Sequence, residues 1–386
     1  MIIVNILFIL SGFMIFWAMI GYPVSILLLG KVFKNRQNKR DWNYKPSVTV
    51  MIVAHNEEKV IKEKLDNVCA LDYYHPIDIL IASDQSTDKT NAIVEEYIKN
   101  HPEFKIRLYK SKKRMGKTNA QNEAQKTVTS EILVMTDANA MLDKQAIKEL
   151  VSCFASPDIF YVTGVLKYIN SSESATAESE NTYWSLDVKV RDIESRIQTI
   201  TAGNGALYAC RNAEYVDFDP IQCHDSAMPY YYGKLGKRAI NCMSAIAYEK
   251  AGETNQDEFK RKVRMNRGIL SDIFESSSFV NIFRYKWATY FFFGHRFARY
   301  MLWLNHIILC FTNSMNFREG ILCYITFIIQ ILIYTVILLQ IIFKTNVKFF
   351  RIVCYYGITV IAQIMGVYNI LTGNVKATWE KVESTR

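Results

Sequence analysis

Glycine and proline are scarce in this chain of 386 residues, which contains 16 and 7 of them respectively. Low-complexity and collagen-like chains are rich in both residues, so these classes are excluded. Half of the residues are hydrophobic and 22% are charged, which excludes a disordered chain as well. We therefore expect most of the sequence to fold around a large hydrophobic core.

Several chemical signatures are missing. The eight cysteines form no Cys-x-x-Cys pair and no zinc-ligand spacing, so free thiols are expected. There is no Gly-x-Ser-x-Gly, His-Glu-x-x-His or Gly-x-Gly-x-x-Gly segment. Gly116-Lys117-Thr118 resembles the end of a P-loop, but Ser111 stands where that motif requires its first glycine. Serine hydrolases, zinc peptidases and P-loop NTPases are therefore disfavoured.

Charge is absent from three long stretches, residues 1–30, 320–343 and 352–375. Each is long enough to cross a bilayer, which needs about 20 apolar residues. Residues 1–30 lack the basic start and the short apolar region of a signal peptide, so we predict a retained transmembrane anchor, with a signal peptide as the alternative.

Positive charge flanks these stretches. Six lysines and arginines lie between Lys31 and Lys45, against the single acid Asp41, and the loop 344–351 is basic without any acid. By the positive-inside rule, both segments and the polar middle of the chain are expected in the cytoplasm.

The C-terminal region, residues 301–375, is expected to hold two or three transmembrane helices. Its first uncharged run, residues 301–317, is short and contains three asparagines and a histidine, so its status stays open. The side of the tail, residues 376–386, stays open with it. Residues 285–300 mix aromatic and basic side chains, which indicates an interfacial amphipathic segment or a plain loop into the membrane.

The middle, residues 46–284, opens with alternating strand-like and helix-like segments. Such alternation predicts an α/β fold with a mostly parallel sheet covered on both faces. The expected strands are Ser47–Val53, Ile77–Ser83, Lys105–Tyr109, Ile132–Thr136 and Phe160–Val165, and the expected helices are Asn56–Ala70, Thr87–Asn100, Lys117–Thr127 and Lys144–Phe154. Ligands of such sheets bind beyond the carboxyl ends of the strands.

Two acids lie at this position. Asp84 follows one expected strand, and Asp137 follows another in the segment Asp137-Ala138-Asn139. An aspartate after a strand is often only a cap or turn residue, which is how we interpret Asp88. The Asp-x-Asn spacing places two oxygen ligands on one side of a turn, which suits Mg²⁺ or Mn²⁺ shared with a diphosphate.

Basic residues cluster between Lys105 and Lys117, within a chain whose net charge is +9. Nucleic acid is not the expected partner, because no binding motif is present and the chain has membrane anchors. Anionic headgroups or a phosphorylated substrate fit this cluster better.

Taken together, these residues resemble glycosyltransferase family 2, whose members have the GT-A fold. The resemblance covers most of the cytoplasmic region and includes Val53-Ala54-His55-Asn56-Glu57-Glu58, Ser83-Asp84-Gln85-Ser86-Thr87-Asp88, Arg114-Met115-Gly116-Lys117 with Asn122, and Thr136-Asp137-Ala138-Asn139. Further matches are Glu180 with Tyr183-Trp184, Gly203-Asn204-Gly205-Ala206, His224-Asp225, and Glu258 to Arg264. The arrangement of membrane anchors on both sides of the catalytic region is similar to that of polysaccharide synthases of the chitin, hyaluronan and cellulose type.

The resemblance implies roles for individual residues. It implies that Asp225 removes the proton from the acceptor hydroxyl in an inverting transfer. It implies that Glu57 and Asp84 bind the base and ribose, that Lys117, Arg261 and Arg264 bind the diphosphate, and that Asp137 and Asn139 hold Mg²⁺ or Mn²⁺. It also implies that the acceptor side of the site is formed by Trp184, Gly203, Asn204, Gly205 and His224.

Two positions depart from the family pattern. His224-Asp225 replaces Glu-Asp or Asp-Asp, and Met265 replaces the tryptophan of the Gln-x-x-Arg-Trp motif of processive members. Methionine cannot stack under a sugar as tryptophan does, which weakens the case for processivity. Trp184 or a tyrosine of the run 230–232 would be the substitute.

We therefore expect a multi-pass protein of the cell (inner or plasma) membrane with a cytoplasmic catalytic domain. It would transfer a sugar from a nucleotide-sugar donor, expected to be UDP-linked, to a growing cell-surface polysaccharide. Addition of one sugar to a polyprenyl phosphate or another lipid-linked acceptor is the alternative, and a non-catalytic nucleotide-sugar sensor is a more distant one. A homo-oligomer or a partner subunit is compatible with the few C-terminal helices.

Overall fold

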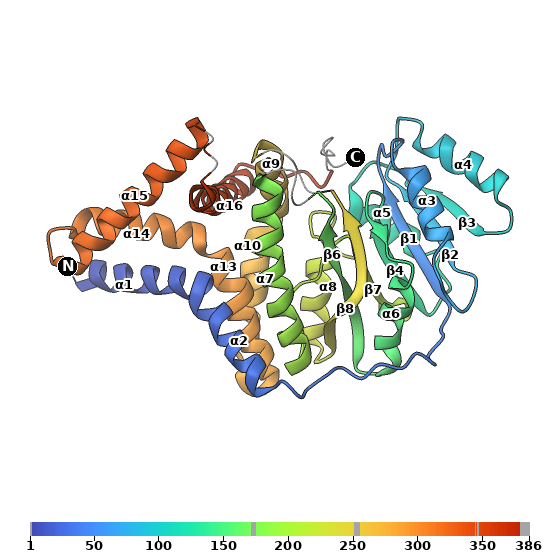
Figure 1. Ribbon diagram of the computed structural model, residues 1–386, viewed down its shortest axis with the longest axis horizontal. Helices are drawn as coiled ribbons and strands as arrows, with labels where there is room; N and C mark the ends of the chain where they lie inside the picture. Colours follow the sequence, from blue (N-terminus) through green and yellow to red (C-terminus); the bar gives the residue numbers. More distant parts are fainter. Residues whose placement is uncertain (1, 171–174, 251–254, 344, 346, 379–386) are drawn as a thin grey trace. The chain divides into compact units, whose positions relative to one another are not determined.

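The computed structural model describes residues 2–170, 175–250, 255–343, 345 and 347–378. The chain forms two compact units, which we describe separately (Figure 1). The sheet unit comprises Phe33–Ser171, Ser185–Ala251 and Val375–Arg386. The helical unit comprises Met1–Val32, Ser172–Trp184 and Gly252–Asn374.

The sheet unit is built on one eight-stranded sheet of order β3-β2-β1-β4-β7-β6-β8-β5. Its strands are β1 (Val48–Ala54), β2 (Asp78–Ser83), β3 (Lys105–Lys110), β4 (Ile132–Asp137), β5 (Met141–Leu142), β6 (Ile159–Tyr168), β7 (Leu207–Arg211) and β8 (Arg238–Glu249). β1 pairs in parallel with β2 and β4, and β2 with β3, whereas β7 runs antiparallel to both β4 and β6.

Helices cover both faces of this sheet. Their bounds are α3 (Ile61–Cys69), α4 (Thr90–Asn100), α5 (Lys117–Gln125), α6 (Ala146–Ser152), η2 (Cys153–Ala155), η3 (Asn212–Glu214) and α8 (His224–Lys234). Side chains of α3, α4 and α6 pack in one core against the sheet, and side chains of α5 and α8 pack in the other. Every residue of β1 and β2 is buried, as expected for strands covered on both faces.

The predicted α/β class with a mostly parallel sheet is confirmed in the first half of the unit. The antiparallel β7 was not predicted, because one short buried strand gives no sign of its direction. Helix α3 begins at Ile61 rather than at Asn56, where the backbone turns with φ of 57°.

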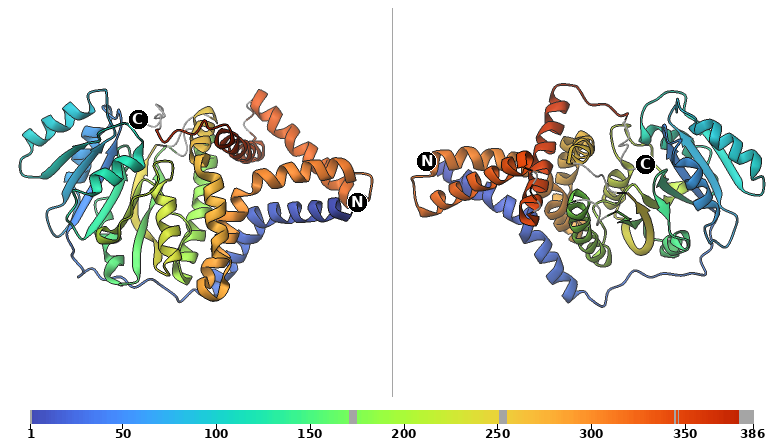
Figure 2. Two further views of the ribbon diagram at one scale, coloured as in Figure 1. Left: turned by 180° about the vertical axis from the view of Figure 1, so that it is seen from behind. Right: turned by 45° about the horizontal axis from the view of Figure 1, so that its top comes forward.

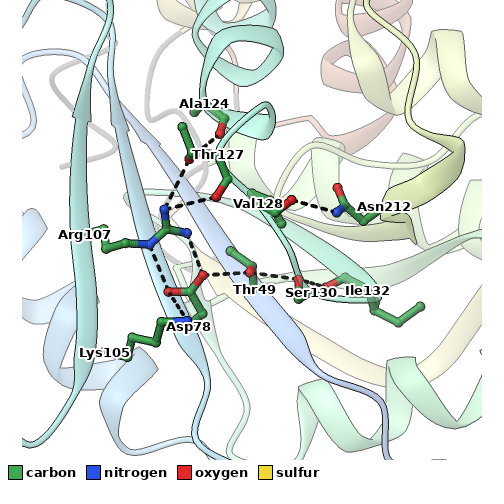
Figure 3. Close-up of polar contacts among 10 residues, drawn as sticks. All are labelled: Thr49, Asp78, Lys105, Arg107, Ala124, Thr127, Val128, Ser130, Ile132 and Asn212. Carbon is green, nitrogen blue, oxygen red and sulfur yellow. Dashed lines mark hydrogen bonds and ion pairs between the residues drawn. The ribbon is translucent and has the colours of Figure 1, made fainter.

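The strand register aligns the ends of the sheet. Ser83 of β2 pairs with Ala54, and Asp137 of β4 pairs with Val53. The carboxyl ends of these strands therefore form one edge, which we call the carboxyl edge. At the opposite, amino edge, Asp78 contacts Thr49, Lys105 and Arg107 in a polar network (Figure 3).

Among its described residues, the helical unit contains helices and connecting turns but no strand. The helices are α1 (Ile2–Phe16), η1 (Trp17–Gly21), α2 (Tyr22–Val32), α9 (Asn255–Met265), η4 (Asn266–Gly268), α10 (Ile269–Ser277), η5 (Ser278–Val280), α11 (Ile282–Tyr285), α12 (Trp287–Phe291), η6 (Phe292–Phe297), α13 (Ala298–Tyr300), α14 (Leu302–Asn316), α15 (Ile321–Phe343) and α16 (Lys348–Leu371). Helix α7 (Ala175–Ile197) has residues in both units.

Three helical stretches of the described residues are long and apolar enough to span a membrane, namely Ile2–Val32, Ile321–Phe343 and Lys348–Leu371. Within the helical unit, α1 and α14 lie side by side (Figures 1 and 2). The two helices are antiparallel, because Asn5 is hydrogen-bonded to Asn316 while Ala18 packs against Leu302.

Candidate active site

Asp84 lies directly after β2 at the carboxyl edge and is fully buried. Its two carboxylate oxygens accept hydrogen bonds from the backbone N–H groups of Met115 and Gly116, at 3.1 and 3.0 Å. Burial raises the pKa of Asp84, although these two amides oppose the shift. In this structure the carboxylate therefore fixes the turn that precedes α5.

That turn delivers Lys117 to the centre of the edge. Lys117 Nζ donates to Asp137 Oδ1 at the end of β4. Burial lowers the pKa of Lys117, but the nearby carboxylates of Asp137 and Asp225 outweigh it, so the net shift is upward. The ammonium group is therefore held in its charged form between two carboxylates.

Gly205 is the point where these three side chains converge. A methyl group added at Gly205 would lie 3.2 Å from Lys117 Nζ, 3.5 Å from Asp137 Oδ2 and 3.9 Å from Asp225 Oδ2. The structure thus brings together three of the predicted site residues around Gly205.

Asp225 reaches this space from the first turn of α8. Its backbone carbonyl accepts a hydrogen bond of 2.7 Å from the N–H of Gly203, which ties the start of α8 to the loop 203–206. The positive end of the helix dipole at this position favours the ionised carboxylate. Gly203 must be small, because a methyl group there would lie 1.9 Å from the hydroxyl of Tyr161.

Two of the predicted site residues, Asn204 and Asn139, have side chains that are hydrogen-bonded to other groups of the protein. Asn204 is buried, donates to Gly164 O at 2.6 Å and accepts from the N–H groups of Ala206 and Leu207, so it shapes the loop. The side-chain amide of Asn139 donates to Glu249 Oε1 at 2.6 Å.

His224 is buried beneath the site and is not part of its surface. Its Nε2 lies 3.1 Å from Asn122 Oδ1 and 3.2 Å from the hydroxyl of Tyr215. Burial, with a contribution from Lys117, lowers the pKa of His224 to about 3, so the ring is neutral at physiological pH. His224 therefore links α8 to α5 and can carry no charge for the chemistry.

Lys64 is a residue that the sequence reasoning missed. It is fully buried in α3, where Nζ donates to Thr136 Oγ1 at 2.9 Å and to the carbonyl oxygen of Ala140. Burial lowers its pKa to about 7, against the opposing influence of Asp137 and Glu249. A signal was present, since Lys64 occupies the apolar face of α3 together with Ile61, Leu65 and Val68.

The remaining predicted residues are placed as follows. Glu57 is buried after β1, and its N–H group donates to Thr90 Oγ1. Arg261 and Arg264 belong to α9 of the helical unit, where Arg261 forms two hydrogen bonds with Glu258, at 2.7 and 2.9 Å. Trp184 falls in α7, and its side chain lies outside the described residues.

A divalent cation fits the carboxyl edge by its donor chemistry. In the described part of the chain, no three histidine, cysteine, aspartate or glutamate side chains gather into a metal cluster. Asp137 and Asp225, however, direct oxygens toward the space beside Gly205. Mg²⁺ is commonly bound by one or two carboxylates together with substrate phosphates, and Asp137 can supply such a carboxylate.

The end of the described chain also returns to this site. A methyl group added at Gly116, where φ is 99°, would lie 2.4 Å from the carbonyl oxygen of Ala377. The segment after α16 therefore packs on the turn that carries Lys117.

Residues 49–212 match the family described as "Glycosyl transferase family 2". The chain is 35% identical over 115 residues to a beta-monoglucosyldiacylglycerol synthase of Synechocystis sp., covering 29% of this chain and 24% of that protein. It is 23% identical over 277 residues to a poly-beta-1,6-N-acetyl-D-glucosamine synthase of Staphylococcus aureus, covering 66% of each. The match to the Synechocystis protein thus spans about a quarter of that relative's length.

The fold is similar to a solved structure over nearly the whole chain. A mannosyltransferase from Pyrobaculum calidifontis, in complex with GDP-Man and Mn²⁺, aligns with a TM-score of 0.71 and 20% identity. The alignment covers 96% of this chain and 100% of that one.

Proposed function

We propose that the chain is an inverting glycosyltransferase that uses a nucleotide-sugar donor, expected to be a UDP-sugar, because residues 49–212 match glycosyltransferase family 2. The observation that supports this proposal is the convergence of Lys117, Asp137 and Asp225 around Gly205. A carboxylate for deprotonation, a carboxylate for a metal and an ammonium for phosphate charge are the groups that such a transfer requires.

In the proposed mechanism Asp225 is the general base. Its carboxylate takes the proton of an acceptor hydroxyl while the hydroxyl oxygen forms a bond to the anomeric carbon of the donor. The bond between that carbon and the diphosphate oxygen breaks on the opposite face, so the anomeric configuration inverts. The nucleoside diphosphate leaves, and no covalent enzyme intermediate forms.

The other residues stabilise the leaving group. Lys117 would turn from Asp137 to the diphosphate, while Glu57 and Asp84 would bind the nucleoside. Asp137, with Asn139 beside it, would hold Mg²⁺ or Mn²⁺, which neutralises diphosphate charge when bound. Arg261 and Arg264 are proposed as further diphosphate ligands, which requires Arg261 to exchange its contact with Glu258.

We propose a membrane-embedded protein whose sheet unit is cytoplasmic and whose acceptor is a growing polysaccharide. The relative from Staphylococcus aureus, which matches along 66% of both chains, supports a polysaccharide acceptor. The glucosyldiacylglycerol synthase and the exposed Met265 favour the second candidate, a single addition to a lipid acceptor.

The test is nucleoside diphosphate release by the full chain in native membranes, across a panel of UDP- and GDP-sugars with Mn²⁺ or Mg²⁺. We expect turnover with one donor and loss of turnover with chelator. Glycan length then separates a polysaccharide product from a single-sugar lipid. Absence of turnover with every donor, despite measured nucleotide binding, would contradict a catalytic function.

A further inference from the structure

Helix α16 is one of the three stretches that are long and apolar enough to span a membrane. Its contacts within the helical unit point to another position. Tyr355, near its start, lies with its hydroxyl 3.2 Å from Glu258 Oε1, and Lys262 Nζ lies 4.3 Å from the centre of the Tyr355 ring. Both partners belong to α9.

The same neighbours contact the far end of α16. A methyl group added at Gly366 would lie 2.8 Å from both the carbonyl oxygen and Cβ of Asn266, which directly follows α9. Val367 packs against Ile269 at the start of α10. From Tyr355 to Val367, a rise of about 18 Å, α16 therefore runs along α9, η4 and the start of α10.

The chemistry of α9 excludes it from hydrocarbon. Its described residues include six charged side chains, Asp257, Glu258, Lys260, Arg261, Lys262 and Arg264. A charged side chain at the bilayer centre is costly, and the hydrocarbon core is about 30 Å thick. If α16 crossed that core, more than half of the thickness would be lined by α9 and η4.

The other face of α16 is apolar and exposed. Its second half exposes Ile361, Ile364, Met365, Tyr368 and Leu371 on one side, whereas Gly366 and Val367 are buried on the other. Figure 1 shows α16 nearly end-on, whereas α1 and α14 run across the page. The axis of α16 is therefore far from parallel to the axes of α1 and α14. Such a one-sided helix is typical of a membrane interface.

Helix α14, by contrast, has the pattern of a helix inside the membrane. It buries Asn305, Thr312 and Asn313 and exposes Ile307 and Phe311, the inverse of a soluble helix. Its buried polar groups have partners, such as Gln330 of α15 at 2.7 Å from Asn313. Helix α14 follows α12, η6 and α13, with the single non-helical residue Met301 before it, so it is the last part of a longer, interrupted helical stretch.

We propose that α16 lies flat in the membrane interface on the side of the sheet unit, with its apolar face on the lipid acyl chains, and that α14 rather than α16 crosses the bilayer. The crossing elements are then α1 with α2, α14 and α15. The loop 344–351 and the tail lie on one side, which agrees with the basic charge of that loop and with the contact of Ala377 on Gly116.

Topology reporters on the full chain test this arrangement. One reporter that is active only in the cytoplasm and one that is active only outside are inserted after Glu103 in the sheet unit, after Glu319, after Thr345 and after Arg386. We expect 103, 345 and 386 on one side and 319 on the other. Sites 345 and 386 on opposite sides would overturn the proposal.

A depth measurement guards against insertions that disturb the helices. A fluorescent non-natural amino acid is placed at 361, 364, 368 or 371, and quenching is measured with lipids brominated at defined depths. We expect one common depth for these four positions and graded depths for positions 325, 328, 332 and 339 of α15. A gradient of about 15 Å between 361 and 371 would show that α16 crosses.

Discussion

The two edges of the sheet use the same residue types for opposite purposes. At the amino edge, Asp78 accepts from Arg107 at 3.1 and 2.6 Å and from Thr49 at 3.0 Å, while Lys105 lies 3.7 Å away (Figure 3). At the carboxyl edge, Asp137 and Asp225 converge on Lys117 and on a space beside Gly205. A carboxylate with fixed partners on both oxygens stabilises the fold, whereas converging carboxylates around a space can bind and transfer a proton.

Substitution of the two carboxyl-edge acids should have the largest effect and should separate their roles. We expect Asp225→Asn to lower turnover by about 10³-fold with nucleotide affinity unchanged, because an amide cannot accept the proton. Asp137→Ala should lose the metal dependence of nucleotide binding as well. Turnover and nucleotide titration with and without Mn²⁺ are the measurements.

The matched control for both is Asp217→Asn, since Asp217 pairs with Lys126 at 3.1 Å on the surface of the same unit. Turnover of this variant should stay within about twofold, because exposed ion pairs contribute little. An Asp225→Asn enzyme with normal turnover would remove Asp225 from the reaction.

Filling the space beside Gly205 should have the next largest effect. Gly205→Ala places a methyl group 3.2 Å from Lys117 Nζ, so the ammonium group has to shift by a few tenths of an ångström. We expect turnover to fall by about 10-fold, since catalysis is sensitive to small misplacements. Gly268→Ala, where the methyl group meets nothing within 4 Å, is the control. Equal turnover of the two variants would contradict a site at this point.

Lys64→Met tests the buried support beneath the carboxyl edge. Loss of its hydrogen bonds to Thr136 and Ala140 should loosen the turn that carries Asp137, so we expect weaker Mn²⁺ activation and about 10-fold lower turnover. Lys62→Met, on the exposed side of the same helix, should change neither quantity. A lower thermal midpoint with unaltered Mn²⁺ activation would leave Lys64 a purely structural role.

A substitution at the amino edge should lower the stability of the fold without changing the turnover of the folded protein. Burial raises the pKa of Asp78, but Arg107 outweighs it, and the net pKa is lowered. Its stabilisation is therefore complete above the unfolded pKa of about 3.9 and is lost as the pH falls through the lower folded value. Asp78→Asn should cost about 2 kcal/mol at neutral pH, with turnover per folded molecule unchanged.

Thermal midpoints of wild type and Asp78→Asn across pH 3 to 7 measure this effect. The difference between them should shrink toward acid, because protonated Asp78 resembles asparagine. A difference that is constant with pH would assign the loss to packing instead of charge.

Much of the sheet could be predicted from the sequence, because its strands are short apolar runs with helices between them. The predicted ends of β2 and β4 agree with the structure to within one residue. This accuracy was sufficient to predict that Asp84 and Asp137 lie at the same edge of the sheet. The antiparallel β7 could not be predicted, nor could the burial of His224, since these depend on how β7 and α8 pack on the rest of the sheet. The burial of Lys64 was missed although its place on the apolar face of α3 could have revealed it.

The sequence by itself determined which stretches are apolar enough to enter a membrane and which strands carry Asp84 and Asp137. It also determined which residue types are available to bind and react. These features depend on composition and periodicity, which are local properties. Tertiary structure decided which of these residues meet. Lys117, Asp137 and Asp225 belong to α5, β4 and α8, and only the fold brings their side chains together beside Gly205. Likewise, the length of α16 permits a membrane span, but its contacts with the charged helix α9 favour a position in the membrane interface. A charged neighbour makes burial in hydrocarbon costly.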